Sequence, residues 1–124
     1  RTAFQRLASL SDLWQPLLGR KDCKAEEQIW VEFDDVKIMV QIDLLFERGG
    51  VVDVAVEIKR STAPTLSRGF HLACAAVRPR QKFLVHGGEH TWPMENGVTA
   101  TALIDLMRLL AGAKAAQRGH RVRT

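Results

Sequence analysis

A chain of 124 residues, 46% of them apolar, is long enough to build one compact core and little more. We therefore expect a single domain over residues 1–124. Eighteen Lys and Arg residues against fourteen Asp and Glu give a formal net charge of +4, which permits contact with polyanions without requiring it. No apolar run reaches the roughly 20 residues that a membrane-spanning helix needs, so that class of protein is excluded.

The start of the chain and its cysteines bear on where the protein works. Residue 1 is an arginine and no apolar segment with a cleavage site follows it, so we expect a piece of a longer protein without a secretory signal. Cys23 and Cys74 lie far apart and match no CxxC metal or redox spacing. We expect both to be reduced thiols of a cytoplasmic protein.

The N-terminal residues predict a helix and then a connector. Apolar side chains recur at three- and four-residue steps over residues 2–18, which is typical of an amphipathic helix interrupted near Pro16 and ending at Gly19. These side chains are Phe4, Leu7, Leu10, Trp14, Leu17 and Leu18. The polar stretch over residues 20–28 predicts a connector.

From Ile29 the apolar period changes to two, which predicts three strands of a meander. The first two strands, over residues 29–33 and 36–47, are separated by a turn at Asp34 and Asp35. A short turn at Gly49 and Gly50 leads into the third strand, over residues 51–60.

The second half of the chain predicts two helices and one more strand. Pro64 and its neighbours end the third strand, and Ser67 or Thr65 caps a helix over residues 68–78. A strand over residues 82–88, a turn at Asn96 and Gly97, and a closing helix over residues 101–116 follow. This order predicts an α/β domain in which the strand after the middle helix joins the sheet by a crossover.

Strand periodicity brings two acidic side chains together. Alternation in the third strand predicts one face with Val52, Val54, Val56 and Ile58, and an opposite face with Asp53, Ala55, Glu57 and Lys59. In the preceding strand it predicts an apolar face of Ile38, Val40, Ile42, Leu44 and Phe46, with Met39, Gln41, Asp43 and Leu45 opposite. Because the turn is short, any register that pairs the apolar faces places Asp43 opposite or diagonal to Glu57.

Two carboxylates about 5–8 Å apart on neighbouring strands repel each other, and burial strengthens the repulsion. Lys59 on the same face supplies one compensating charge, and a divalent cation would supply more. Hard carboxylate oxygens suit Mg²⁺ or Mn²⁺. Such an ion beside a lysine can hydrolyse a phosphodiester, because the metal activates water and the phosphoryl group while the lysine orients the water. The simpler alternative is a Glu57–Lys59 charge pair on an exposed sheet face, with a solvated Asp43.

Asp43, followed after thirteen residues by Glu57-Ile58-Lys59, resembles the PD-(D/E)XK signature of the restriction-endonuclease-like superfamily. Residues 41–110 resemble the domain of unknown function at the C-terminus of many bacterial and archaeal AAA+ family ATPases. The resemblance implies a mixed sheet of about four or five strands flanked by helices, and it implies that the chain is the C-terminal fragment of a longer ATPase.

The same resemblance assigns roles to four residues. It makes Asp43 and Glu57 metal ligands, adds the backbone carbonyl of Ile58 as a further ligand, and makes Lys59 the catalytic lysine. The implied cofactor is Mg²⁺ or Mn²⁺.

The sequence departs from the family pattern at two points. Gln41 stands where the family commonly has glutamate, and the first helix offers Asp12 where active members often have a glutamate. A third acidic ligand would then have to come from Glu26, Glu27 or Glu32, and the sequence does not distinguish among them.

The resemblance implies a metal-dependent, endonuclease-like hydrolase acting on nucleic acid, with the ATPase domain of the same protein as partner. Five basic residues follow or flank the predicted site and are candidates for contacting the nucleic-acid backbone, with solvated surface charge as the alternative: Arg60, Arg68, Arg78, Arg80 and Lys82. The alternative is a catalytically degenerate nuclease fold that serves the ATPase as a nucleic-acid-binding or protein-interaction module. Self-association is left open.

A second group, His86, Glu89 and His90, carries side chains that bind zinc elsewhere. Because Gly87 and Gly88 predict a turn between the two histidines, a solvated loop is the preferred interpretation.

Overall fold

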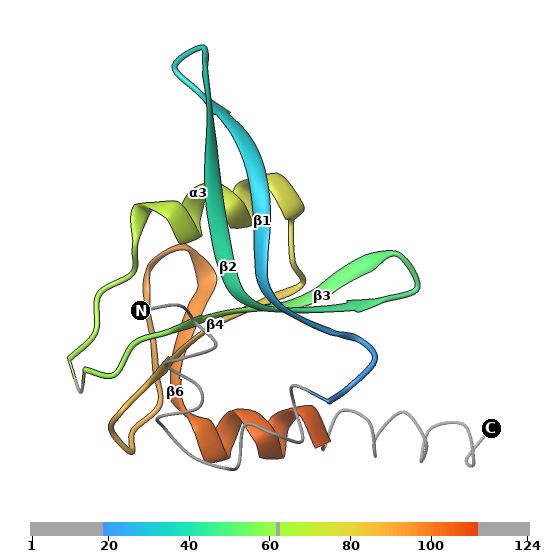
Figure 1. Ribbon diagram of the computed structural model, residues 1–124. Helices are drawn as coiled ribbons and strands as arrows, with labels where there is room; N and C mark the ends of the chain where they lie inside the picture. The colour runs from blue at the N-terminus through green and yellow to red at the C-terminus, as the bar shows by residue number, and fades with distance from the viewer. Residues whose placement is uncertain (1–18, 62, 112–124) are drawn as a thin grey trace.

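The computed structural model describes residues 19–61 and 63–111. These residues form an α/β domain with a mixed six-stranded sheet in the order β1-β2-β3-β4-β6-β5 (Figure 1). The strands are β1 (Cys23–Phe33), β2 (Val36–Arg48), β3 (Val51–Ile58), β4 (Gln81–His86), β5 (Trp92–Pro93) and β6 (Val98–Ala102). Helix α3 (Arg68–Val77), the short 3₁₀ helix η1 (Glu95–Gly97) and a helix over residues 103–111 complete the described part. The helix predicted over residues 2–18 lies outside the described residues.

Both predicted hairpin turns are confirmed. Asp34 and Asp35 connect β1 to β2 with φ angles of 50° and 62°. Gly49 and Gly50 connect β2 to β3 with φ angles of 59° and 78°. Positive φ at both central residues matches the twist of the flanking strands, and Asp and Gly tolerate it better than most residues.

The predicted crossover is also confirmed, because β3 and β4 are parallel and α3 lies between them in the chain. Of the two candidate caps, Ser67 is the one observed: its hydroxyl accepts a hydrogen bond from the Phe70 N–H at 3.1 Å. The helix ends at Arg78, which adopts a left-handed conformation and donates its N–H to the Cys74 carbonyl at 2.8 Å.

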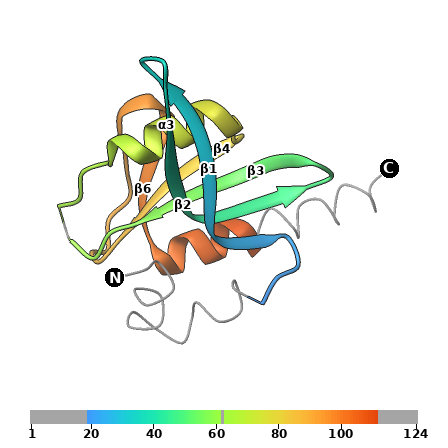
Figure 2. The same cartoon turned by 45° about the horizontal axis from the view of Figure 1, so that its top comes forward.

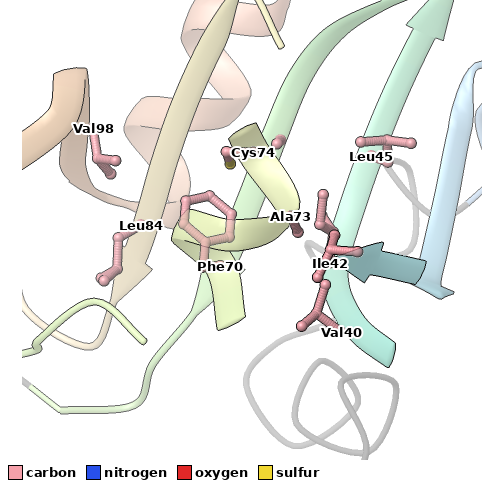
Figure 3. Packing of buried hydrophobic residues seen from close by; sticks show 10 residues of the cluster. Val40, Ile42, Leu45, Phe70, Ala73, Cys74, Leu84 and Val98 are labelled. Carbon is pink, nitrogen blue, oxygen red and sulfur yellow. The ribbon is translucent and has the colours of Figure 1, made fainter. Parts of the chain in front are cut away.

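The two larger helices cover opposite faces of the sheet (Figure 2). Phe70, Ala73 and Cys74 of α3 pack on Val40, Ile42, Leu45 and Leu84, among others (Figure 3). Leu106 and Leu110 of the helix over residues 103–111 pack on the other face, against Leu44, Phe46, Val54, Val56, Ile58, Phe83 and Val85. The sheet is therefore the middle layer between two separate apolar clusters.

The predicted number of strands and two predicted boundaries differ from the structure. The sheet has six strands where four or five were predicted, because β6 and the two-residue β5 were missed. Residues 98–102 pair with β4 and are mostly buried, so the final helix begins at residue 103, not 101. Strand β1 begins at Cys23 inside the predicted connector, because its polar residues pair with the apolar second half of β2.

The strict alternation of faces is wrong at two positions. Ile42 and Leu44 belong to opposite clusters, and so do Val52 and Val54. The β1–β2 ladder has no Cα partners at Asp43 and Glu26, and Glu26 has a φ of 55°. The β2–β3 register shifts between Phe46 and Glu47, and Asp53 has no Cα partner in β2. Each irregularity turns the strand, so residues two apart reach different faces.

Among the described residues, no helix combines the length and the apolar character needed to cross a membrane.

Candidate functional site

The candidate site lies where β2 turns away from β3. The last paired residues of the two strands are Leu44 and Val56, and the next pair in this register is Asp43 opposite Glu57, as predicted. The part of β2 that precedes Asp43 pairs with β1 and forms a two-stranded ribbon, which extends past α3 (Figure 1). The divergence opens the sheet beside the two carboxylates.

The Asp43 side chain takes the place of the missing strand partner. It is buried, and its Oδ2 accepts a hydrogen bond from the Ile58 N–H at 2.8 Å. In an extended strand the N–H and C=O of one residue point to the same side. The Ile58 carbonyl therefore points toward the edge that Asp43 borders, while the next N–H, of Lys59, donates to the Val85 carbonyl of β4.

The Glu57 carboxylate is held by two groups from its own neighbourhood. Its Oε2 accepts a hydrogen bond from the Ser67 N–H at 3.3 Å, and its Oε1 lies 3.7 Å from the Lys59 Nζ. Glu57 is 7% exposed, as is Asp43, whereas the Lys59 side chain is 40% exposed. Two nearly buried carboxylates thus face a lysine that still reaches solvent.

These residues line an open pocket of about 330 Å³. Its described walls are Asp43, Glu57, Ile58, Lys59 and Arg60, so the four residues singled out for metal and catalytic roles share one cavity with a predicted nucleic-acid contact. The sequence did not predict that the Ser67 N–H would donate a hydrogen bond to Glu57. Its position just before a helix pointed to a cap, but nothing local showed which residue its N–H would reach.

The backbone around Arg60 is fixed by the segment after β4. The Gly87 N–H donates to the Ser61 carbonyl at 3.2 Å. A Cβ on Gly87 would lie 2.5 Å from the Arg60 carbonyl oxygen, a distance at which backbone has to move. Glycine at this position therefore allows the two segments to approach, and it keeps residues 59–61 against the end of β4.

None of the three expected sources supplies a third acidic ligand. Within residues 19–61 and 63–111, no three His, Cys, Asp or Glu side chains gather closely enough to hold a metal ion. Glu26 and Glu27 are half-buried in β1, and Glu32 is exposed near the ribbon tip. Asp12 of the predicted first helix lies outside the described residues.

The basic residues do not form one group around the pocket. Arg60 lines it, whereas the guanidinium of Arg68 stacks over the Phe33 ring, 4.3 Å from the ring centroid. Arg78 and Arg80 precede β4, and β4 begins beside Val54, several residues before the pocket end of β3. Parallel pairing places Lys82 beside Ala55, two residues before Glu57, and the described lining of the pocket includes Arg60 but none of Arg78, Arg80 and Lys82.

The prediction of a solvated loop fits Glu89 and His90, which are exposed, but it is wrong for His86, which ends β4 and is buried. The buried His86 ring accepts from the Gly88 N–H at 2.9 Å and lies 2.6 Å from the His90 carbonyl oxygen, so both ring nitrogens face backbone. The ring also packs on Trp92, with the centroids 4.7 Å apart. His86 fixes the loop after β4 and is not oriented to share a zinc ion with His90.

Comparisons of the chain with models of protein families, with curated proteins and with solved structures find no match.

Proposed function

We propose that this chain is a restriction-endonuclease-like domain that hydrolyses a phosphodiester bond of nucleic acid with the help of Mg²⁺ or Mn²⁺. The observation that carries the proposal is the convergence of Asp43, Glu57 and Lys59 in one open pocket where two strands separate. The strand meander followed by a parallel crossover supports it, since this arrangement accompanies the PD-(D/E)XK signature that the sequence resembles.

The donor set suits a hard divalent cation. The carboxylates of Asp43 and Glu57 would hold it, together with the Ile58 carbonyl, which points to the same edge. A bound ion of this kind would polarise the phosphoryl oxygen and lower the pKa of an attacking water. The hydrogen bonds from Ile58 and Ser67 fix the two carboxylates before any ligand arrives.

Lys59 and Arg60 would act on the substrate itself. The Lys59 ammonium, tethered near Glu57 and partly in solvent, is placed to orient a water and to stabilise negative charge developing on the phosphoryl oxygens. The exposed Arg60 at the pocket rim would attract a phosphate of the backbone. On the same resemblance, we place the domain at the C-terminus of a cytoplasmic ATPase.

One observation favours a second candidate function. The Glu57 carboxylate is already compensated by the Lys59 ammonium and by the Ser67 N–H, without a metal ion. A domain of this kind could bind nucleic acid, or contact its ATPase, without hydrolysis.

Titration calorimetry with Mg²⁺ and Mn²⁺, followed by cleavage assays on DNA and RNA, separates the two functions. Asp43→Asn and Glu57→Gln remove charge while keeping an oxygen that accepts the Ile58 or Ser67 N–H, so both variants should fold and lose metal binding. Lys59→Ala should keep metal binding and lose roughly 10²-fold or more in cleavage rate. Lys24→Ala, which removes an exposed lysine paired with Glu47, should behave like the wild type.

Nucleic-acid binding without metal binding or cleavage would support the second candidate. Cleavage that survives in Asp43→Asn and Glu57→Gln would overturn the site assignment.

A further inference from the structure

The chain that follows β3 is held by the end of β4, at the rim of the pocket. Lys59 donates its N–H to the Val85 carbonyl at 2.8 Å. In a regular parallel ladder the next hydrogen bond would join the Gly87 N–H to the Lys59 carbonyl. Gly87 donates instead to the Ser61 carbonyl, two residues further along, at 3.2 Å. Arg60 therefore lies in a bulge of the chain, and its side chain lines the pocket.

Gly87 lies directly against this bulge. A Cβ at residue 87 would lie 2.5 Å from the Arg60 carbonyl oxygen and 3.3 Å from the carbonyl carbon, so the two backbones are in close contact. The position of Gly87 therefore limits the position of the Arg60 backbone. A movement of the loop after β4 would shift the pocket rim.

The His86 imidazole fixes that loop. Its Nδ1 accepts a hydrogen bond from the Gly88 N–H at 2.9 Å, and its Nε2 lies 2.6 Å from the His90 carbonyl oxygen. A backbone N–H only donates and a carbonyl only accepts, so the ring carries its proton on Nε2 and donates it to His90. The ring is 6% exposed and packs on Trp92. A buried ring with both nitrogens hydrogen-bonded holds the intervening backbone in one shape.

We propose that His86 is a positioning residue for the pocket: through the loop over residues 87–90 it keeps Arg60 at the rim, where Arg60 meets a phosphate of nucleic acid. This role rests on the proposed function, in which Arg60 attracts the nucleic-acid backbone. The described lining of the pocket does not include His86, so the imidazole acts through Arg60 and does not touch the substrate.

The effect of His86 should fall on substrate binding more than on the chemical step. The carboxylates of Asp43 and Glu57 and the ammonium of Lys59 are held by contacts with β3 and with the residue before α3, and not by the loop after β4. Loss of the His86 hydrogen bonds should therefore raise KM and leave kcat nearly unchanged.

Amide hydrogen exchange of the full chain, followed by NMR, tests the structural part without any substrate. His86→Phe keeps a ring against Trp92 and removes both hydrogen bonds. We expect the Gly87 N–H to exchange at least tenfold faster in this variant, while the Ile58 N–H, which donates to Asp43, exchanges at the wild-type rate. Unchanged exchange at Gly87 would overturn the proposal. Equal acceleration at both amides would also overturn it, because that result shows a general loss of stability.

Two conservative substitutions separate the two hydrogen bonds. His86→Asn places an amide oxygen near the former Nδ1, where it can accept from Gly88. His86→Gln places an amide nitrogen near the former Nε2, where it can donate to His90. Each should restore part of the slow exchange at Gly87 that His86→Phe loses. If neither restores any of it, the hydrogen bonds of the ring do not fix the loop.

Gly87→Ala tests the contact with Arg60, because the added Cβ forces the two backbones apart and leaves the His86 ring in place. Gly69→Ala is the matched control: it adds the same methyl group in α3, 3.8 Å from the Val40 side chain, which is an ordinary contact. We expect Gly87→Ala and His86→Phe to raise the KM for nucleic-acid cleavage several-fold, and Gly69→Ala to leave it unchanged. A wild-type KM in Gly87→Ala would contradict the proposal.

A double-mutant cycle with Arg60→Ala shows whether His86 and Arg60 act as one unit. His86→Phe should raise KM in the wild-type chain and have little effect in the Arg60→Ala chain. Additive effects, or a fall in kcat with an unchanged KM, would overturn the proposal.

An absence of cleavage refutes the proposed hydrolysis and leaves this proposal testable. The hydrogen-exchange comparison still decides whether His86 fixes the loop, and the dissociation constant for double-stranded DNA then replaces KM in the cycle. A chain that neither cleaves nor binds DNA removes the role of Arg60 and overturns the proposal with it.

Discussion

At the scale of single residues, the ionisation of Cys23 depends on its neighbours at the start of β1. The pKa of the Cys23 thiol is raised from 9.0 to about 11, chiefly by burial and also by the Asp22 carboxylate, while the Arg20 guanidinium opposes both. Burial also raises the pKa of Asp22, but the hydrogen bonds and charge of Arg20 outweigh it, so the pKa of Asp22 lies below its usual value. The Arg20 guanidinium donates to both Asp22 oxygens, at 2.9 and 2.6 Å.

Replacing Asp22 by Asn should make Cys23 more reactive. The substitution removes a nearby negative charge and leaves Arg20 uncompensated, and both changes lower the pKa of the thiol. Because the thiolate is the reactive form, we expect the alkylation rate of Cys23 by iodoacetamide at pH 8 to rise several-fold, as followed by mass spectrometry. Cys74, buried on the side of α3 that packs on the sheet, is the internal control and should react at an unchanged rate. An unchanged Cys23 rate would show that burial alone sets its pKa.

At the scale of elements, the start of α3 connects the fold to the pocket. The Ser67 hydroxyl caps the helix by accepting from the Phe70 N–H, while the Ser67 N–H donates to Glu57. The side chain therefore stabilises the helix, and the backbone holds the carboxylate. A substitution that removes the hydroxyl separates these two roles.

Ser67→Ala should lower the free energy of unfolding by about 1 kcal/mol, because one N–H of the first helical turn loses its acceptor. Urea denaturation followed by circular dichroism measures this change. Ser67→Asp keeps an acceptor and should retain most of the stability. Thr65→Ala, at the alternative cap position that the structure does not use, should have little effect. If Thr65→Ala were the more destabilising variant, the assignment of the cap would be wrong.

The ribbon of β1 and β2 is the element whose direction creates the site. Its ladder loses regularity at Glu26 and Asp43, and β2 leaves β3 at that point. The Asp43 carboxylate then accepts a hydrogen bond from the Ile58 N–H. If β2 continued beside β3, a backbone carbonyl of β2 would accept this hydrogen bond instead. The pocket is thus a consequence of strand divergence, and the acidic residue at the divergence also stabilises it.

At the scale of the whole molecule, stability depends on a helix on each face of the sheet. The helix over residues 103–111 presents Leu106, 1% exposed, to a cluster that includes Leu44, Val56 and Val85. Ile104 in the same helix is 42% exposed. The two positions differ in burial while sharing a helix and a similar side-chain size.

Leu106→Ala should lower the free energy of unfolding by about 2–4 kcal/mol, because it removes buried methyl groups and leaves a cavity. Ile104→Ala should change it by about 0.5 kcal/mol or less, since the side chain is largely in water already. Thermal and urea unfolding of the two variants beside the wild type provide the comparison. Similar losses for both variants would contradict the packing of this helix on the sheet.

Local chemistry allowed much of the fold to be predicted from sequence alone. The turns at Asp34–Asp35 and Gly49–Gly50 follow from residues that tolerate positive φ, and the cap of α3 follows from a hydroxyl just before an apolar helical period. The closeness of Asp43 and Glu57 follows from a short turn and a period of two, although the final register also depends on the shift between Phe46 and Glu47. Each of these features depends on a few neighbouring residues.

Tertiary structure decided the features that depend on distant segments. The polar start of β1 became a strand because an apolar strand lay beside it, and residues 98–102 became β6 because β4 offered a buried edge. The exchange of faces between Ile42 and Leu44, the stacking of Arg68 on Phe33 and the support of Glu57 by Ser67 all join residues that no local pattern relates. The sequence alone determined that Asp43, Glu57 and Lys59 lie near one another, because a short turn joins their two strands. Packing of the ribbon, the sheet and the helices determined where the pocket opens, because burial and strand direction depend on the whole chain.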